Sequence, residues 1–292
     1  MLAIAVIPKG TTHKFWKSIE AGARQAAEEL GVEMVWKGPL NVDDRAQQIS
    51  IVDQFASEGK NGIVLAPIDE TALRRPVQSA MEKNIPVLII DSPLTGEVGK
   101  DFISFVGTNN KLGAGIAGET LAKLLDGKGN VVLLRYREDC ASTRRREEGF
   151  LETIKKHPDI QVLVGDLYAG GMTAEAQASA ISIIDKLRQA DGIFCSHEPS
   201  TLGMLLALRQ NNLLGKIKFV GFDTSPPLVE GLRRGEIHAL MAQNPKKIGY
   251  EGVKIIVAYL HGEQVLRSVD TGVVLVTQEN LNSPEIQKLL GL

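Results

Sequence analysis

Short runs of apolar, often β-branched residues alternate along the chain with longer stretches in which apolar residues recur every three or four positions. The short runs are typical of buried strands, and the recurrence is typical of amphipathic helices. The first strand is expected at residues 3–7, and the helix that follows it ends at Gly31, a common helix terminator. The apolar stripe of this helix is expected to comprise Phe15, Ile19, Ala23, Ala26 and Leu30.

The same rhythm continues and then restarts after Gly107, which predicts two similar halves. In the first half, strands are expected at 32–36, 62–66, 86–90 and 103–106, with helices at 43–57 and 70–83. In the second half, a helix is expected at 111–125 and strands at 131–134, 161–164, 192–195, 217–220 and 238–241. Strands that alternate with helices predict an α/β protein with two doubly wound, parallel, Rossmann-like sheets.

The C-terminal part, with a helix at 246–261 and one strand at 269–276, is too short for a third domain and must pack onto the first two. We therefore expect one lobe from residues 1–106 with 244–268, and another from 107–243 with 269–292. More than one chain crossing between lobes predicts a hinge. Open α/β sheets bind ligands at the carboxyl ends of their strands, so the lobes are expected to share a ligand cleft there.

Composition narrows the function classes. A chain of 292 residues suits two domains, and 33 Lys and Arg against 35 Asp and Glu leave a net charge of −2, without the basic excess that nucleic-acid binding needs. No apolar run approaches the roughly 20 residues of a membrane helix. Residues 1–10 resemble a first strand and lack the basic region and cleavage site of a signal peptide, so either the protein is cytoplasmic or its export signal lies outside this sequence.

Motifs of enzymes and cofactor sites give little support for catalysis. Gly113, Gly115 and Gly118 match G-x-G-x-x-G, but the expected strand ends near Val106, which puts these glycines inside a helix and favours packing over dinucleotide binding. Phosphate-loop, zinc-protease, nucleophile-elbow and C-x-x-C patterns are missing from the sequence. The two cysteines have no metal-type spacing, and reduced thiols are favoured over a disulfide. We therefore expect no catalytic residues, no metal and no cofactor.

Polar and aromatic residues recur just beyond the expected strand ends, where a doubly wound sheet places its binding crevice. They suit a polyol, because aromatic rings can cover its C–H faces while carboxylates accept from its hydroxyls and cations or amides donate to them. Asp91 and Asp223 balance Lys9 and Arg144, which favours a neutral ligand, while His13 and His197 leave an anionic ligand as an alternative. The candidate ligand-binding residues are Lys9, His13, Phe15, Trp16, Asp91, Ser92, Arg144, His197, Asp223 and Gln243.

These residues, together with the segments around them, resemble the type I periplasmic binding proteins of ABC transporters, in the branch that resembles ribose-binding protein. The resemblance covers nearly the whole chain and is carried by the segments 15–23, 85–91, 144–150, 202–203 and 220–223, with Gln243 after the next strand. It implies a solute-binding component that closes on a sugar or polyol by hinge motion. The implied partners are membrane permease subunits. A monomer is expected, in the periplasm or lipid-anchored outside the cell.

Two departures from the ribose-binding pattern concern the ligand. Ser92 stands where ribose binders typically have arginine, and His197-Glu198 where they have Asn-Asp, so a ligand other than ribose is expected. Lys9 resembles the lysine of autoinducer-2-binding relatives, but Arg144 departs from their pattern. A ligand-sensing protein that reports to a receptor, and a sugar-acting enzyme, remain alternatives. LacI-type repressors share the fold but begin with a DNA-binding headpiece, whereas a core strand is expected here already at residues 3–7.

Overall fold

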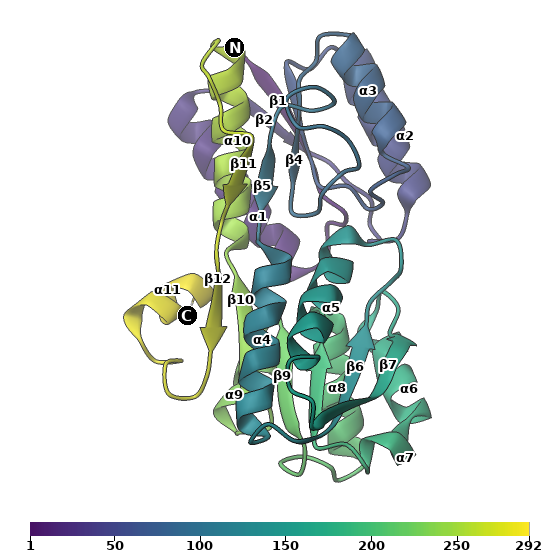
Figure 1. The fold of residues 1–292 in the computed structure, drawn as a ribbon. Coiled ribbons are helices and arrows are strands. Elements are labelled where there is room, and N and C mark those ends of the chain that lie inside the picture. The colour runs from purple at the N-terminus through teal and green to yellow at the C-terminus, as the bar shows by residue number, and fades with distance from the viewer. Residues whose placement is uncertain (292) are drawn as a thin grey trace. The chain divides into compact units, whose positions relative to one another are not determined.

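The computed structural model describes residues 1–291 and contains two six-stranded sheets, shown with their helices in Figure 1. The first has the order β11-β5-β4-β3-β1-β2 and the second the order β12-β10-β9-β8-β6-β7. All strand pairs are parallel except β10 with β12. The expected α/β class with two doubly wound parallel sheets is therefore confirmed.

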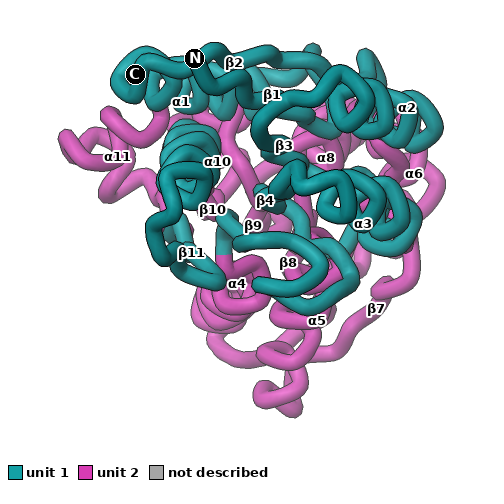
Figure 2. The backbone as a smooth tube through the Cα atoms, turned by 90° about the horizontal axis from the view of Figure 1, so that it is seen from above, with its two compact units in different colours: residues 1–108, 139–141, 244–272 teal, residues 109–138, 142–243, 273–292 magenta. Residues whose placement is uncertain are grey.

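The chain divides into two compact units, coloured separately in Figure 2: unit 1 holds residues 1–108, 139–141 and 244–272, and unit 2 holds 109–138, 142–243 and 273–292. Unit 1 contains β1 (Ala3–Ile7), α1 (Lys14–Leu30), β2 (Glu33–Trp36), α2 (Arg45–Ser57), β3 (Gly62–Leu65), α3 (Arg74–Glu82), β4 (Val87–Ile90), β5 (Phe105–Gly107), α10 (Pro245–Leu260) and β11 (Ser268–Asp270). The remaining elements, α5 apart from its first residue, belong to unit 2: α4 (Asn110–Leu124), β6 (Gly129–Arg135), α5 (Ala141–Ile154), β7 (Ile160–Tyr168), α6 (Thr173–Ser182), α7 (Ile184–Leu187), β8 (Gly192–Cys195), α8 (Glu198–Gln210), β9 (Lys218–Phe222), α9 (Pro226–Arg233), β10 (Ala239–Gln243), β12 (Val273–Val276) and α11 (Pro284–Leu290).

The single strand expected at 269–276 is wrong, because the segment forms two strands in different sheets. β11 pairs with β5 in unit 1, and β12 pairs with β10 in unit 2. Gly272 has a φ of 84°, and its N–H donates to Asp270 Oδ1 at 2.9 Å, which makes a tight turn between the two strands. The C-terminal part packs onto both halves, as expected.

In unit 1, α1 and α10 pack side by side at backbone distance (Figures 1 and 2). A Cβ built on Gly22 would lie 1.9 Å from the carbonyl oxygen of Lys246, and one built on Gly249 would lie 2.0 Å from that of Ile19. Only glycine permits this approach. The expected stripe of α1 is partly wrong, because Phe15 is half-buried and Leu30 exposed; the buried face consists of Trp16, Ile19, Gly22, Ala23, Ala26 and Ala27.

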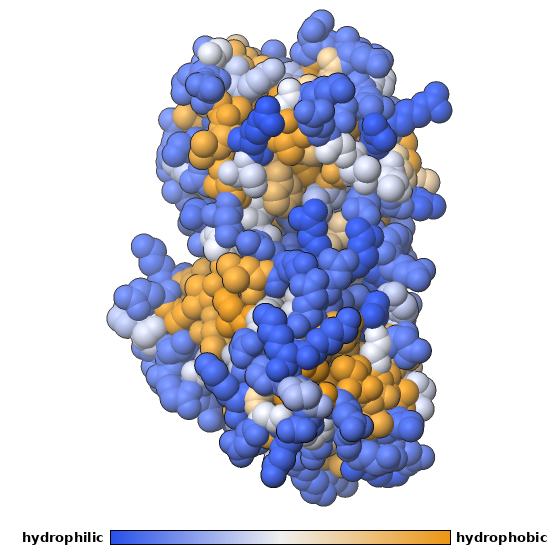
Figure 3. Space-filling view, viewed as in Figure 1, coloured by the Kyte–Doolittle hydropathy of each residue, from blue (hydrophilic) through white to orange (hydrophobic). Residues whose placement is uncertain are grey.

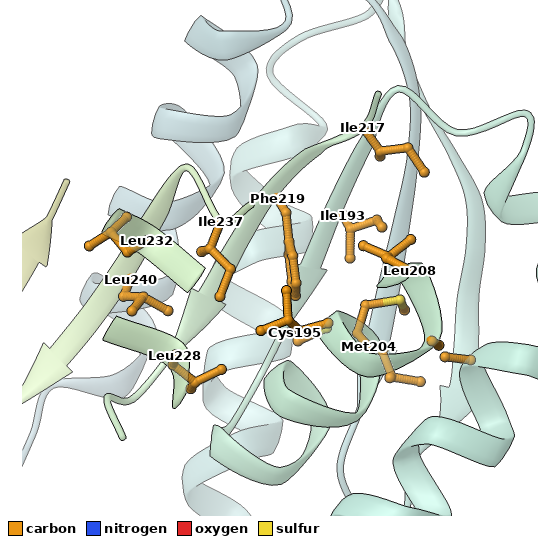
Figure 4. Packing of buried hydrophobic residues seen from close by; sticks show 14 of the residues in the cluster. Ile193, Cys195, Met204, Leu208, Ile217, Phe219, Leu228, Leu232, Ile237 and Leu240 are labelled. Carbon is orange, nitrogen blue, oxygen red and sulfur yellow. The ribbon is translucent and has the colours of Figure 1, made fainter. Parts of the chain in front are cut away.

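In unit 2, apolar side chains from β8, β9 and β10 meet those of α8 and α9 in one core (Figure 4). Phe219 and Cys195 point from the sheet into this core, where Met204 and Leu208 of α8 pack. The buried environment raises the pKa of the Cys195 thiol well above its ordinary value. Such a thiol is unreactive at neutral pH.

The G-x-G-x-x-G segment lies inside α4, as the sequence predicted. Cβ atoms on Gly113 and Gly118 would lie 3.1 Å from Val273 Cγ1 and 3.0 Å from Thr153 Cβ, so both glycines serve close packing of α4 against β12 and α5. These glycines do not form the strand-to-helix turn that a dinucleotide fingerprint requires.

The face drawn in Figure 3 is largely hydrophilic, with smaller apolar areas. One apolar area lies over β12 and the adjoining part of α4, where Val274 and Leu112 are exposed. Among residues 1–291, none of the helices combines the length and apolar character needed to span a membrane.

His238, just before β10, makes the stability of unit 2 depend on pH. Its Nδ1 accepts the backbone N–H of Phe219 at 3.2 Å, and burial, followed by the charge of Lys218, lowers its pKa below the ordinary 6.5. The unfolded chain therefore binds this proton at higher pH than the folded chain does. Neutral His238 therefore contributes its full share to the stability of the fold above pH 6.5. This contribution is lost as pH falls through the lower pKa of His238 in the folded protein.

We expect His238→Asn, whose amide oxygen can replace Nδ1 as acceptor, to make the unfolding midpoint less sensitive to acid. Calorimetry from about pH 7.5 to about pH 5 measures this dependence. His261→Asn, at an exposed histidine that ends α10, is the control. Equal acid sensitivity of His238→Asn and the unmodified protein would contradict the assignment.

Candidate functional site

Two of the candidate residues, Asp91 and Asp223, occupy equivalent places in the two sheets. Both sheets have the 2-1-3-4-5 order of doubly wound folds, with an added sixth strand, and β4 of unit 1 corresponds to β9 of unit 2. Asp91 directly follows β4 and Asp223 directly follows β9, and both have a left-handed backbone, with φ of 63° and 70°. Each unit thus presents a carboxylate at the carboxyl end of the same strand.

In unit 1, Lys9 and Asp91 form a buried ion pair. Lys9 Nζ lies 3.0 Å from Asp91 Oδ2 and donates to Cys140 Sγ at 3.7 Å. The two side chains of the ion pair are 9% and 6% exposed, and Ser92 beside Asp91 is also buried. Because β1 and β3 flank the point where the strand order reverses, Lys9 lies beside the usual ligand crevice of the sheet.

Gln48 of α2, which the sequence analysis did not select, fixes the chain before Lys9. Its amide nitrogen donates to the carbonyl oxygens of Pro8 at 3.0 Å and Ala66 at 2.8 Å, and its amide oxygen accepts the N–H of Ile68 at 2.8 Å. This fully buried side chain ties together the segments that follow β1 and β3. A glutamine inside an otherwise apolar helix face is the sequence signal that could have revealed it.

The aromatic candidates of unit 1 begin α1. His13 is the residue before the helix, Phe15 is half-buried, and Trp16 belongs to the hydrophobic core beneath the helix. The two rings meet edge to face, with centroids 5.1 Å apart. Trp16 thus supports Phe15, whereas Phe15 retains exposed surface.

In unit 2, Asp223 is held by three donors. Gln243 Nε2, at the end of β10, donates to Oδ1 at 2.5 Å, while the N–H of Glu198 donates to Oδ2 at 3.3 Å. Arg146 Nη1 lies 3.5 Å from the same Oδ2. These three donors order the carboxylate. The Asp223 side chain is nevertheless 15% exposed, so it retains some accessible surface.

His197 follows β8 and lies against Tyr136, which follows β6. Their ring centroids are 4.1 Å apart, and His197 Nδ1 lies 2.7 Å from Ser200 Oγ in the first turn of α8. β6 and β8 flank the reversal of strand order in this sheet, so the two rings lie beside its crevice. The sequence analysis did not select Tyr136, although it is an aromatic residue directly after a strand, the pattern that could have revealed it.

The structure separates the roles of neighbouring arginines in α5. The Arg144 side chain is 41% exposed, and its Nε lies 3.9 Å from Oε1 of Glu148. Arg146, which the sequence analysis did not select, is buried and contacts Asp223. Burial raises the pKa of the adjacent Glu147, against the opposing effect of the Tyr136 N–H and Arg135.

Two further observations concern metal binding and disulfide formation. Within residues 1–291, no three His, Cys, Asp or Glu side chains are grouped closely enough to hold a metal ion. Cys140 and Cys195 are thiols and not a disulfide, as the sequence favoured. The two site carboxylates, Asp91 and Asp223, are each paired with a cation and suit hydrogen bonding to hydroxyl groups.

Known proteins are similar to this chain over most of its length. The family described as periplasmic binding protein domain matches residues 4–264. The ribose import binding protein RbsB of Escherichia coli is 27% identical over 281 residues, which cover 94% of this chain and 90% of RbsB.

Solved structures extend the likeness to the whole chain. A carbohydrate transporter solute-binding protein from Agrobacterium radiobacter, in complex with D-arabinose, is 33% identical with a TM-score of 0.94, over 99% of this chain and 98% of that one. An ABC transporter solute-binding protein from Agrobacterium vitis, bound with α-D-tagatopyranose, is 28% identical with a TM-score of 0.93, over 99% of both chains. The expected type I periplasmic binding protein fold is confirmed, and the chain belongs to the family of periplasmic binding proteins.

Proposed function

We propose that this protein is the solute-binding component of an ABC transporter and binds a monosaccharide or related polyol. The observation that carries the proposal is the repeated carboxylate: Asp91 and Asp223 end equivalent strands of the two units and are both held by cations. An ordered carboxylate accepts hydroxyl donors strongly, because a charged acceptor forms shorter and stronger hydrogen bonds. Units 1 and 2 serve as the two ligand-binding lobes.

In this proposal, one ligand contacts candidate residues of both units. Unit 1 contributes Lys9, Asp91 and Ser92, with His13 and the Phe15 ring supported by Trp16. Unit 2 contributes Arg144, His197, Asp223 and Gln243. Several charge-assisted bonds of about 1.5 to 3 kcal/mol each can offset desolvation and reach the roughly 8 kcal/mol of micromolar binding.

The ligand is a neutral pentose or ketohexose other than ribose. Lys9 offsets Asp91 and Arg146 offsets Asp223, so the charges of both buried carboxylates are already compensated by protein cations, which favours a neutral ligand. The relatives in complex with D-arabinose and α-D-tagatopyranose support this size. Ser92 supports the exclusion of ribose, because a serine cannot supply the guanidinium donors typical of ribose binders.

A thermal-shift screen of pentoses, hexoses, ketohexoses, polyols and deoxysugars tests the proposal. At about one hundred times its Kd, the preferred ligand stabilises the folded protein by about 2.7 kcal/mol, so a clear rise in the unfolding midpoint is expected for a small subset. Calorimetric titration then gives a Kd near or below micromolar. The absence of a stabilising sugar, or tighter binding of ribose than of any other sugar, would contradict the corresponding part of the proposal.

The protein returns its ligand chemically unchanged and is not an enzyme. Prolonged incubation with the preferred sugar, followed by NMR of the recovered ligand, is expected to show no conversion, and conversion would favour the enzyme alternative. We further propose that the protein acts as a monomer in the periplasm or lipid-anchored outside the cell, delivers its ligand to permease subunits, and binds no nucleic acid. Light scattering of the purified protein tests the monomer.

A further inference from the structure

Lys9 and Cys140 bring two reactive side chains into contact within unit 1. Lys9 Nζ donates to Cys140 Sγ at 3.7 Å and lies 3.0 Å from Asp91 Oδ2. Cys140 is 4% exposed and Lys9 is 7% exposed, so the amine and the thiol meet out of bulk water. The two residues are 131 positions apart in the sequence, yet both belong to unit 1. The fold therefore creates this pair of nucleophiles.

Two features of this position favour the thiolate of Cys140, which is the form of a cysteine that reacts with oxidants. One is the Lys9 ammonium, and the other is α5, which begins at the next residue, Ala141. Cations and helix N-termini both stabilise a neighbouring thiolate. Cys195 is the contrasting case, because it lies in an apolar core that raises the pKa of its thiol well above the ordinary value. The two thiols of the chain are thus in opposite chemical settings.

A peroxide can join the two side chains in two balanced steps. First, the Cys140 sulfur attacks one peroxide oxygen and the O–O bond breaks, which gives a sulfenic acid, while the other oxygen leaves and is protonated to water. Next, Lys9 gives one proton to Asp91, and its nitrogen lone pair attacks the Cys140 sulfur. The S–O bond breaks, and the oxygen leaves with a second nitrogen proton as water. The product is a sulfenamide, the class of product that sulfenic acids also form with backbone nitrogens.

We propose that Lys9 and Cys140 form a peroxide-sensitive modification site, in which an S–N bond between them withdraws the Lys9 cation from Asp91. The flexible four-carbon stem of lysine can close the distance to the sulfur. A sulfenamide nitrogen carries no positive charge, so Asp91 loses the cation that holds and compensates it. Sugar affinity should then fall about tenfold, the effect of one lost charge-assisted bond. This last step rests on the proposed sugar-binding function.

Hydrogen peroxide added to the sugar-free protein tests the site directly. Intact mass spectrometry is expected to show a species two hydrogens lighter than the untreated protein, and a peptide map should join residue 9 to residue 140. Dithiothreitol, a thiol reductant, should restore the original mass. Lys9→Arg keeps the cation, but its guanidinium stays protonated and cannot attack the sulfur. In that variant Cys140 should gain oxygen instead of forming the link.

Two serine variants identify the sulfur that reacts. Cys140→Ser keeps an acceptor beside Lys9 and should form no link, whereas Cys195→Ser should form the link as the unmodified protein does. Calorimetric titration with the preferred sugar, before and after peroxide, should show the loss of affinity in the unmodified protein and its recovery with dithiothreitol. Peroxide should not change the affinity of Cys140→Ser.

The outcomes separate this proposal from the proposed function. An unreacted Cys140, oxygen added to Cys140 without a link to Lys9, or a disulfide between Cys140 and Cys195 would overturn the modification site. A link that leaves sugar affinity unchanged would overturn its effect on Asp91. If the untreated protein binds no sugar, the proposed function fails, and the peptide map alone decides whether Lys9 and Cys140 react. That map needs only the unmodified protein, so it is decisive even if Lys9→Arg does not fold.

Discussion

Alanine in place of Gly249 is expected to lower the unfolding free energy of unit 1 by about 3 kcal/mol, the upper part of the usual range for overpacking. The new Cβ would lie 2.0 Å from the backbone carbonyl oxygen of Ile19. A backbone atom inside a helix cannot rotate away, so α1 and α10 must separate and lose contact with each other along their length. The gain of about 1 kcal/mol in helix propensity offsets only part of this loss.

Calorimetry of Gly249→Ala is expected to show a midpoint lower by roughly 6 to 12 °C. The matched control is Gly115→Ala, another glycine inside a helix, where the nearest atom to a built Cβ is Thr153 Oγ1 at an ordinary 3.4 Å. The control should be neutral or slightly stabilising, since alanine favours helix. Equal midpoints for the two variants would mean that the two helices are not held at backbone distance.

Asparagine in place of Asp91 is expected to weaken sugar binding about one hundredfold, equivalent to about 2.7 kcal/mol and within the range for a charge-assisted hydrogen bond. Asparagine is the appropriate replacement because residue 91 has a φ of 63°, which asparagine adopts readily and alanine does not. The substitution thus removes the charge with little backbone strain. Calorimetric titration with the preferred sugar measures the loss, and Asp53→Asn, at an exposed position of α2, is the control.

The unfolding free energy of the Asp91→Asn variant shows whether the substitution weakens sugar binding directly or by damaging the fold. Asp91→Asn removes the carboxylate charge 3.0 Å from the Lys9 ammonium, and breaking a buried ion pair typically costs about 3 to 5 kcal/mol. Combining it with Lys9→Gln removes both charges and should restore much of the stability but not the affinity. Recovery of affinity in the double variant would show that Asp91 serves the fold and not the ligand.

The sequence predicted the parts of this molecule that depend on local pattern. Apolar runs located most of the strands, and the polar residue after a run correctly placed Asp91 and Asp223 at strand ends, which a parallel sheet brings to the same edge. Gly31 ends α1 with the left-handed backbone expected of it. The strand at 269–276 was misassigned because Asp270 and Gly272 form a turn that the continuous apolar pattern concealed.

The positions of the arginines around the axis of α5 explain why the sequence analysis selected Arg144 and missed Arg146. Three arginines occupy 144–146, and the sequence analysis chose Arg144 both as a polar residue beyond the strand expected at 131–134 and on the family resemblance. Residues three and four positions from Arg146, namely Ser142, Thr143, Gly149 and Phe150, are small or apolar and all buried, so Arg146 lies on the inner face of α5. That spacing was present in the sequence. The contacts of Arg146 with Asn110, Ser196 and Asp223 join distant segments, and no local pattern could have indicated them.

The discontinuity of unit 1 has a consequence for biosynthesis. Residues 1–108 supply five strands of its sheet, but α10 and β11 belong to 244–272. At about 5 to 20 residues per second, the ribosome delivers that last part roughly seven to thirty seconds after the first. During this interval the face of α1 that contains Gly22 has no partner helix, so the N-terminal part of the nascent chain keeps apolar surface uncovered and completes its core only near the end of synthesis.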